Sequence, residues 1–455
     1  MKLWIMLFLS TLLFGRSIPE GYISPIPADV LTKPDVHVHF GELHFDDGTL
    51  LPESKQKIED ELAYMQLSGL YFKNHEAVWL ELLREELQRL SITPNKTLAI
   101  TASPITSKVL WPRLDPGMVY TVALLDTRQT PVILQLPGSF SSARILDHYG
   151  NTLAVLDANS SYLLYGPDEK FVPATQLKRV GENDTELQGI QSDTYISFLF
   201  IQMPRENDLA TFESQLKIMP LEGDQSEQNS FVDIASAQSI ALLPKSARFF
   251  KLLDTIAQYD ALPAHKANEL ATAGITKGKL FQPDMHKRAL LQDAAHTAGI
   301  ILQNTPALNK LQALSEKVEN IRLEVDDTNT TLDGAKHYVL HIPSVPAKSW
   351  SVTLYDTQTA SMLQNPLQLR PYILSSNEDL HYNDDGSIDI HFAPNMEDEA
   401  LEANTIKTVA GKKFFAIVRF YSPKQECCSE ETGLQIKEFD ENAPKEEPNE
   451  DIGIF

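Results

Sequence analysis

The sequence predicts a mainly β protein with some helix, in which two β-sandwich domains of jelly-roll type are joined by a helical segment. Between about residues 98 and 221, short β-type runs such as VYTVALLD and TYISFLFIQM are bounded by Gly, Pro, Asn or Asp. That spacing is typical of a sandwich. Apolar residues recur at helical spacing between about residues 233 and 323, and strands then resume up to Pro423. A chain of 455 residues is too long for one core, so several domains are expected.

The first 17 residues, MKLWIMLFLSTLLFGRS, have the composition of a secretory signal peptide. Lys2 precedes an apolar run, and small residues follow it. The run is too short to span a bilayer. We therefore expect an exported protein, periplasmic or extracellular, that is not inserted in the membrane after cleavage. A retained N-terminal anchor is the alternative.

The remaining segments are assigned from their patterns. Residues 18–54 form a Pro-rich connector with a short hairpin, and residues 55–92 form a helical lead-in with Trp79 on its apolar stripe. Residues 93–222 and 326–424 form the two sandwiches, and residues 223–325 form the helical region between them. Within that region one helix face collects Phe249, Leu252, Leu253 and Ile256. Residues 425–455 are acidic and are predicted to be a disordered tail.

The charge and the cysteines exclude several classes of protein. The formal net charge is −23, and loss of Lys2 and Arg16 with the signal peptide would make it −25. Such a chain repels phosphate backbones and anionic lipid surfaces, so nucleic acid is not an expected partner. The two cysteines, Cys427 and Cys428, are adjacent. Because adjacent cysteines seldom pair with each other, no disulfide framework is expected.

The stretch DVHVHF, residues 35–40, has two interpretations. In an extended chain Asp35, His37 and His39 share one face. Imidazole is a common zinc ligand, and D-x-H-x-H resembles the first strand of metal-dependent amidohydrolases. That chemistry is built on a barrel of alternating strands and helices, whereas here two β blocks flank one helical block. We therefore interpret the stretch as a structural strand and expect no metal or other cofactor.

The stretch LHYNDDGSIDIHF, residues 380–392, is predicted to form a hairpin. A three-residue loop with Gly386 in a left-handed bulge is favoured, because it pairs apolar residues across the strands. In that register Ile388 lies opposite Tyr382, and Ile390 lies opposite Leu380. The other face then holds two carboxylates and two imidazoles, those of Asp379, His381, Asp389 and His391. They could bind a metal or act in acid-base chemistry, but we interpret them as Asp-His contacts across a solvated sheet surface.

Both β blocks resemble known families. VYTVALLDTRQTPVILQLPG, residues 119–138, with the LDHYGNTLAVL and YLLYGP stretches that follow, resembles domain of unknown function 1254. WSVTLYDTQTASMLQNPLQLRPY, residues 350–372, with the later FFAIVRFYSP, resembles domain of unknown function 1214. The two domains usually occur in tandem in exported bacterial proteins. The resemblance covers about residues 62–423 and implies two sandwiches joined by helices, but no particular reaction.

Residues of the family pattern are candidates for a binding site. Those selected as candidates are Asp115, Tyr120, Asp126, Trp350, Tyr355, Asn365 and Arg419. The pattern also includes Leu125, Pro131, Pro137, Ser351, Thr353, Asp385, Gly386, Ser387, Tyr421 and Pro423. The chain departs from the pattern at RLDPGMVY, which keeps Asp115 and Tyr120 but loses an Asn and a Thr. It departs again at ANTIKTVAG, where only Asn404 remains of an Asn-Trp-Leu-Pro turn.

Several single residues allow more than one interpretation. Trp350 is interpreted as a core residue, with a sugar-stacking platform as the alternative. Arg419 is a charge on a strand and needs a carboxylate partner if it is buried. His337 and His341 are interpreted as surface residues. Sequons, which would be modified only in a eukaryotic secretory route, occur at Asn95, Asn159, Asn183 and Asn329.

The motifs leave three functional hypotheses. The sequence contains no G-x-S-x-G, Walker loop, Rossmann glycine pattern or H-E-x-x-H motif. The leading hypothesis is a non-catalytic module that binds a small molecule or glycan, because sandwiches offer sheet faces and end loops as sites. The alternative is a cell-envelope hydrolase with paired carboxylates, using Asp115 or Asp126 near Tyr120. The third is an assembly component, for which a homo-oligomer would be expected.

Overall fold

The computed structural model describes residues 26–168, 187–303, 318–423 and 434–439, except residues 227, 280, 345–346, 397 and 399–400 and the side chains of residues 259 and 303. The predicted signal peptide, both cysteines and Asn183 lie outside the described residues. The chain divides into two units, one ending at Tyr64 and one beginning at Met65. Within the described ranges, no helix has the length and apolar character needed to cross a membrane.

The first unit contains a three-stranded antiparallel sheet and the start of the long helix α1 (Pro52–Arg89). The 3₁₀ helix η1 (Ala28–Val30) precedes the strands β1 (Asp35–Val38), β2 (Gly41–Asp46) and β3 (Thr49–Leu50). The predicted strand in DVHVHF is confirmed as β1, in which Asp35 lies opposite His44 and His37 opposite Glu42. His39 lies in the turn after β1 and does not extend the shared face.

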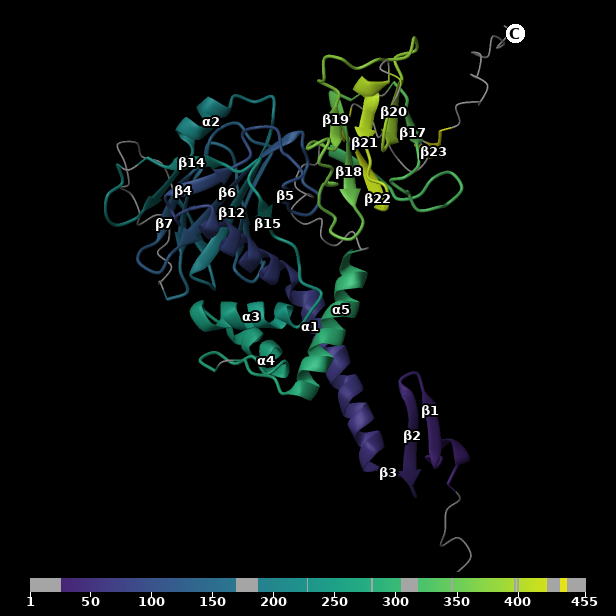
Figure 1. Ribbon diagram of the computed structural model, residues 1–455. Helices are drawn as coiled ribbons and strands as arrows, with labels where there is room; N and C mark the ends of the chain where they lie inside the picture. The colour runs from purple at the N-terminus through teal and green to yellow at the C-terminus, as the bar shows by residue number, and fades with distance from the viewer. Residues whose placement is uncertain are drawn as a thin grey trace, which may run out of the picture. The chain divides into compact units, whose positions relative to one another are not determined.

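In the second unit, residues of the first β block form a sandwich, called here the first sandwich (Figure 1). One sheet has the order β14-β4-β6-β12-β8-β9, and the other has the order β11-β10-β7-β13. The strands of the first sheet are β4 (Thr97–Ile100), β6 (Met118–Asp126), β8 (Ser142–Asp147), β9 (Thr152–Val155), β12 (Ile196–Pro204) and β14 (Ser230–Asp233). Those of the second are β7 (Val132–Gln135), β10 (Ser161–Tyr165), β11 (Leu187–Gln191) and β13 (Lys217–Pro220). Leu125, Leu134, Leu164 and Leu199 belong to the core between the sheets.

Smaller elements accompany this sandwich. The short strands β5 (Val109–Leu110) and β15 (Ser239–Ile240) pair in parallel. Helix α2 (Leu209–Gln215) precedes β13, and Asp208 caps its N-terminus by accepting a hydrogen bond from the backbone N–H of Thr211.

Helix α1 packs against the other face of the six-stranded sheet. Trp79 of α1 stacks on Phe200 of β12, with ring centroids 6.1 Å apart, and its indole N–H donates to the carbonyl oxygen of Ala241. Trp79 is buried, which confirms its predicted place on the apolar stripe. Strands β6 and β12 are therefore covered on both faces. This explains why both strands are buried along almost their whole length and show no alternation of buried and exposed residues.

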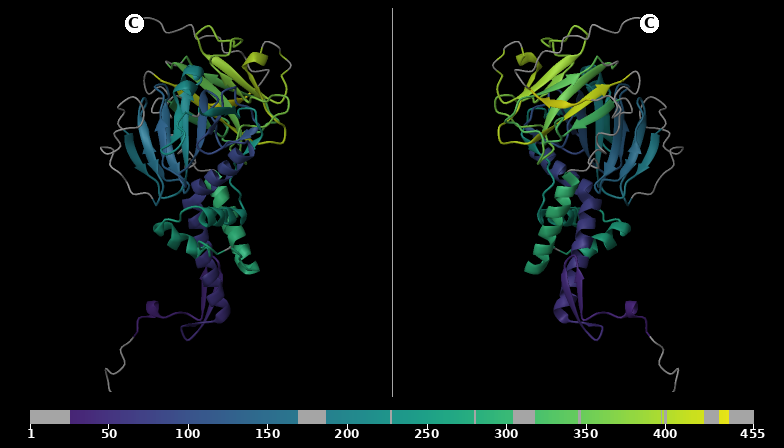
Figure 2. Two further views of the ribbon diagram at one scale, coloured as in Figure 1. Left: turned by 90° about the vertical axis from the view of Figure 1, so that its left-hand side faces the viewer. Right: turned by 90° about the vertical axis from the view of Figure 1, so that its right-hand side faces the viewer.

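Three further helices pack beside α1 (Figure 2). They are α3 (Arg248–Tyr259), α4 (Ala264–Thr272) and α5 (Met285–Gln303). Phe249 of α3 stacks on Tyr71 of α1 at a centroid distance of 3.9 Å. The predicted apolar face of α3 is confirmed, since Phe249, Leu252, Leu253 and Ile256 are all buried.

The second β block forms the second sandwich. Its sheets have the orders β16-β22-β18-β19 and β21-β20-β17-β23. Their strands are β16 (Val318–Leu323), β17 (Tyr338–Ile342), β18 (Ser349–Asp356), β19 (Tyr372–Leu374), β20 (Ile388–Ala393), β21 (Thr405–Lys407), β22 (Phe414–Tyr421) and β23 (Ile436–Glu438), and the 3₁₀ helix η4 (Glu402–Asn404) precedes β21. A core that includes Leu340, Val352, Ile390 and Val418 lies between the sheets. Two sandwiches with intervening helices confirm the predicted fold class.

For residues 380–392 the predicted turn is confirmed, but the predicted strand pairing is wrong. Gly386 has a φ of 82°, and the backbone N–H of Asn383 donates to the carbonyl oxygen of Ser387 across the three-residue loop. Strand β20 forms as expected, but it pairs with β17, so that Ile390 lies opposite Leu340 and Asp389 opposite His341. Residues 380–387 are not a strand. The buried amide of Asn404 holds this segment instead, because its side chain binds the backbone N–H and carbonyl of His381 and the carbonyl of Asp389. A distant apolar strand thus replaced the local partner that the sequence suggested.

The tail prediction is wrong for residues 434–439. Strand β23 pairs antiparallel with β17, and Ile436 is buried in the second core. Phe439 follows β23 and lies against His337, with ring centroids 4.2 Å apart. Leu434 also packs against this core, so three apolar residues anchor a segment whose acidic surroundings in the sequence concealed them.

Candidate functional site

The loop between β5 and β6 carries Asp115, the first predicted site residue. Asp115 is 6% exposed. Its backbone N–H donates to the hydroxyl of Tyr120, and its carboxylate Oδ1 accepts from the backbone N–H of Gly117, each at 2.9 Å. Tyr120 of β6 therefore fixes the loop that presents the carboxylate.

The second sandwich supplies the partners from the outer face of one sheet. On β18 and β22, Val352 and Val418 point into the core, so Ser351, Tyr355, Arg419 and Tyr421 lie on the opposite face. The alternation follows from the sequence SWSVTLYD, in which Trp350, Val352 and Leu354 alternate with Ser351, Thr353 and Tyr355. The face meets the Asp115 loop, so family-pattern residues that are far apart in the sequence converge.

The contacts define what is called here the Asp115 cluster, made of Asp115, Tyr355, Arg419 and Tyr421. The hydroxyl of Tyr421 donates to Asp115 Oδ1 at 2.5 Å, and Arg419 Nε lies 3.6 Å from Asp115 Oδ2. Arg419 Nη1 donates to the hydroxyl of Tyr355 at 2.9 Å. The Tyr355 hydroxyl donates in turn to the carbonyl oxygen of Leu114 at 2.6 Å. Arg419 is 2% exposed, so its predicted carboxylate partner is confirmed as Asp115.

Burial sets the protonation states in this cluster. Burial alone would lower the pKa of Arg419, but Tyr355 and Asp115 beside the guanidinium raise it above its ordinary value. Burial and the Asp115 carboxylate raise the pKa of Tyr421 well above its ordinary value. Tyr421 therefore keeps its proton and acts as a hydrogen-bond donor, which makes it unsuited to be a general base at neutral pH.

A cleft of about 770 Å³ lies beside the Asp115 cluster and is lined by both sandwiches. The first sandwich contributes Gly117, Phe140 and Ser141, and the second contributes Trp350 and Tyr421. Gly117 is required here because a Cβ at this position would collide with the Tyr421 hydroxyl. Tyr421 thus forms part of the cleft wall while it binds Asp115 of the other domain.

The other candidate residues lie elsewhere or have other partners. Trp350 packs partly against the second core and also lines the cleft, and its role as a sugar-stacking platform stays a prediction. Asn365 donates to the carbonyl oxygens of Lys407 and Thr408 and has a structural role. Asp126 lies at the far end of β6 from Tyr120, which is roughly 20 Å away for six residues of strand. It forms an ion pair with Arg128.

The histidine candidates do not assemble a metal centre. In the first unit they form separate pairs with carboxylates, such as His39 with Glu61 at 3.0 Å and His44 with Asp35 at 2.7 Å. His341 pairs with Asp389 at 2.7 Å, where the sequence predicted His381 as the partner. His391 bonds to His337 at 3.0 Å, where Asp379 was predicted. Across the described residues, no group of three or more His, Cys, Asp or Glu could hold a metal ion.

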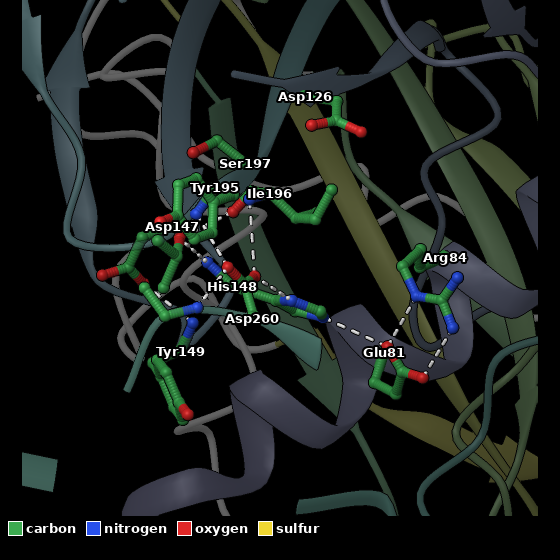
Figure 3. Close-up of polar contacts among 12 residues, drawn as sticks. Glu81, Arg84, Asp126, Asp147, His148, Tyr149, Tyr195, Ile196, Ser197 and Asp260 are labelled. Atoms are coloured by element: carbon green, nitrogen blue, oxygen red, sulfur yellow. Dashed lines mark hydrogen bonds and ion pairs between the residues drawn. The ribbon is translucent and has the colours of Figure 1, made fainter. Parts of the chain in front are cut away.

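A second polar cluster, shown in Figure 3 and called here the His148 cluster, was not predicted from the sequence. It consists of Glu81 and Arg84 of α1, His148 after β8, and Asp260 at the end of α3. His148 Nδ1 lies 2.7 Å from Asp260 Oδ2, and Nε2 lies 3.1 Å from Glu81 Oε2. Arg84 binds Glu81 through two hydrogen bonds. Only the tertiary structure could reveal these contacts, because the four residues come from three distant segments.

The geometry requires a protonated His148. Both ring nitrogens face carboxylate oxygens, and ionised carboxylates only accept hydrogen bonds, so both nitrogens carry protons. Burial by itself lowers the pKa of His148, but the bonds to Asp260 and Glu81 outweigh it and leave that pKa raised. For Glu81, burial is opposed by Arg84 and His148, and its pKa falls to about 2. His148 and Glu81 are fully buried, which indicates a structural role for this cluster.

Comparison with known families identifies both sandwiches. Residues 95–219 match the family described as "Protein of unknown function (DUF1254)", and residues 319–425 match "Protein of unknown function (DUF1214)". The matches follow each other in the predicted tandem order and together cover just over half of the chain. The comparison with curated proteins found no match.

Two solved structures align with most of the chain at low identity. The VPA0106 protein from Vibrio parahaemolyticus is 14% identical with a TM-score of 0.48, and the alignment covers 83% of this chain and 100% of that chain. An uncharacterized protein from Burkholderia cenocepacia is 11% identical with a TM-score of 0.38, and the alignment covers 85% of this chain and 96% of that chain. The assignment rests on the two family matches, which agree with the resemblance seen in the sequence: the chain belongs to the tandem family in which a DUF1254 domain precedes a DUF1214 domain.

Proposed function

We propose that this protein binds a small polar organic ligand, without transforming it, in the cleft between its two sandwiches. The observation that carries the proposal is a cleft of about 770 Å³ that both domains line and that borders the Asp115 cluster. Its volume falls within the roughly 300–1,000 Å³ that is typical of small-molecule sites.

The Asp115 cluster supports binding because it fixes the cleft walls. Tyr421 belongs to the wall on the second sandwich and is bound to Asp115 of the first sandwich. Ser351 also hydrogen-bonds to the Tyr421 hydroxyl, at 3.0 Å. A wall held by buried hydrogen bonds is ordered before the ligand arrives, so less conformational entropy is lost on binding.

The hydrolase hypothesis has less support. A glycosidase needs two carboxyl groups roughly 5–10 Å apart in one cleft. Asp126 lies at the other end of β6 from Tyr120 and does not line this cleft. Among the described lining residues, Glu206 is the one carboxylate, and it forms an ion pair with Lys348. The described lining of this cleft therefore gives no support to a pair of catalytic carboxylates.

A cleft-blocking variant tests the proposal. Ser376 lines the cleft and is exposed, so Ser376→Trp should fill the cleft without disturbing a core. Ser226→Trp, at an exposed serine that does not line the cleft, is the matched control. We would screen the full chain against a library of small polar metabolites by thermal shift and native mass spectrometry. At least one compound should bind the wild type and the control but not Ser376→Trp; if no compound separates these variants, the proposal is wrong.

We also propose that the protein is exported. The support is the composition of residues 1–17, in which one basic residue precedes an apolar run and small residues. N-terminal sequencing of the protein from its native source should give a mature chain that begins near residue 18. A chain that still begins at Met1 would contradict export by cleavage.

A further inference from the structure

The charged side chains that line the cleft are engaged by the protein itself. The guanidinium of Arg205 donates to four backbone carbonyl oxygens, those of residues 101, 102, 116 and 118. Lys348 of the second sandwich forms an ion pair with Glu206 of the first. Asp115, which lies behind Tyr421, is already bound to Arg419. Four of the five N–H groups of Arg205 are thus occupied, although carbonyl oxygens do not neutralise its charge, and the charges of Lys348 and Glu206 balance each other.

The remaining polar groups of the lining are mostly hydroxyls. Ser141 lies on the wall from the first sandwich, and Ser349 and Ser376 lie on the wall from the second. The side-chain hydroxyls of these serines make no hydrogen bond to another described residue. Aromatic side chains lie on both walls as well, Phe140 on the first and Trp350 on the second. The lining therefore combines hydroxyls that can donate and accept with apolar ring surface.

From these observations we infer that the ligand is uncharged and rich in hydroxyl groups, as a neutral oligosaccharide is. The inference rests on the proposed function and narrows it to one ligand class. An anion would enter against the field of a chain with a formal net charge of −23, and the lining guanidinium of Arg205 already has four of its five N–H groups occupied by backbone carbonyls. A cation would find no lining carboxylate that is not already paired, and a charge desolvated without a partner costs free energy. Hydroxyl groups of a sugar can instead exchange hydrogen bonds with the serines.

The test uses two sets of immobilised hexasaccharides. Neutral probes are the malto-, cello-, xylo- and chito-hexaoses, and the acidic probe is a hexamer of galacturonic acid. The full chain should bind at least one neutral probe, and Ser376→Trp should weaken that binding at least about tenfold while Ser226→Trp changes it less than about twofold. Between about 50 mM and 500 mM NaCl the dissociation constant should change less than about twofold, because salt screens charge-charge attraction and leaves neutral hydrogen bonding largely unaffected.

The outcomes separate this inference from the proposed function. If the galacturonic acid hexamer binds and Ser376→Trp abolishes that binding, the neutral ligand class is wrong but the cleft remains a binding site. Binding of a neutral probe that is unaffected by Ser376→Trp would also overturn the inference, since the site would lie elsewhere. If no saccharide binds, the ligand class is wrong, and the metabolite screen alone decides whether the cleft binds a ligand.

Discussion

The His148 cluster and the Asp115 cluster have the same kind of ion pairing but differ in their exposure to solvent. Each buries a cation against a carboxylate and thereby joins segments that are distant in the sequence. His148 and Glu81 are fully buried between helix α1 and the ends of the inner strands β8 and β12 (Figure 3). In the Asp115 cluster, Tyr421 is partly exposed and faces a cleft.

This difference distinguishes a structural cluster from one that supports a binding site. Buried ion pairs lose much of their Coulombic gain to desolvation, so neither cluster is good evidence of stability by itself. A closed cluster can only fix the fold. A cluster with one member in a cleft wall also determines the shape that a ligand meets, which is why we place the function at Asp115 and not at His148.

Removing His148 should have the largest effect. In His148→Ala the carboxylates of Glu81 and Asp260 lose the cation between them and stay buried, which should lower the free energy of unfolding by about 4–5 kcal/mol. Urea unfolding followed by circular dichroism measures this. His341→Ala is the control, because His341 pairs with Asp389 at an exposed site and should change little. Equal losses in the two variants would contradict the structural role of the His148 cluster.

The same cluster gives a pH dependence with a defined sign. The pKa of His148 is raised in the folded protein, so its stabilising effect is fully present below the unfolded pKa of about 6.5. It is lost as the pH rises through the higher folded pKa. Stability measured from pH 6 to 9 should therefore fall more in the wild type than in His148→Ala.

Removing Arg419 should have a somewhat smaller effect on stability and a specific effect on the cleft. Arg419→Met leaves Asp115 without its cation, and the loss should be about 3 kcal/mol, because Tyr421 and Gly117 still donate to the carboxylate. Arg128→Met, which breaks an exposed pair with Asp126, is the control. Ligand binding should weaken in Arg419→Met and not in Arg128→Met. A variant that lost stability but kept full binding would show that the cluster does not shape the cleft.

Acid should weaken the attachment of β23 to a smaller degree. Burial and the neighbouring His337 lower the pKa of His391 to about 4. Because the unfolded chain binds that proton more readily, stability should fall as the pH drops from about 6.5 towards 4. Phe439 packs against both imidazoles, so hydrogen exchange of the amides in residues 434–439 should accelerate over this range. His391→Gln should remove most of the acceleration, and an unchanged profile in this variant would contradict the assignment.

Breaking the exposed ion pair between Glu206 and Lys348 in the cleft should have the smallest effect on stability. Glu206 and Lys348 are more than half exposed, so Glu206→Gln should change the free energy of unfolding by less than about 0.5 kcal/mol. If the ligand is neutral, its affinity should also be nearly unchanged in Glu206→Gln. A large change in affinity would indicate that a charge on the ligand meets this pair.

Several features could be predicted from the sequence because their causes are local. The apolar period of α1 and α3 predicted both helices and the buried Trp79 and Phe249. The alternation of β18 places Val352 and Ser351 on opposite faces of the sheet. Arg419 was expected to need a carboxylate partner if buried, because a lone buried charge is costly, and Asp115 is that partner. Each of these inferences depends only on spacing along the chain or on the cost of a lone buried charge.

The wrong predictions concern residues for which the local sequence pattern allows more than one pairing partner. The apolar pattern of residues 380–392 favoured Ile390 opposite Leu380. In the structure Ile390 lies opposite Leu340, which is equally apolar and belongs to strand β17. Both pairings bury the same side chain, so the sequence alone could not choose between them. His148 lies in LDHYGNTLAVL, a stretch that resembles the family, but neither its burial nor its carboxylate partners could be inferred from that stretch.

The sequence by itself determined the fold class, the tandem family and the face of β18 that enters a core. These properties depend on the spacing of apolar residues and on short motifs, both of which can be recognised in consecutive residues of the chain. Only the tertiary structure decided that Asp115 meets Arg419 and Tyr421 beside a cleft, and that Glu81, His148 and Asp260 form a closed cluster. The physical reason is that burial and partner distance set the pKa values and the binding surface, and both are properties of contacts between distant segments.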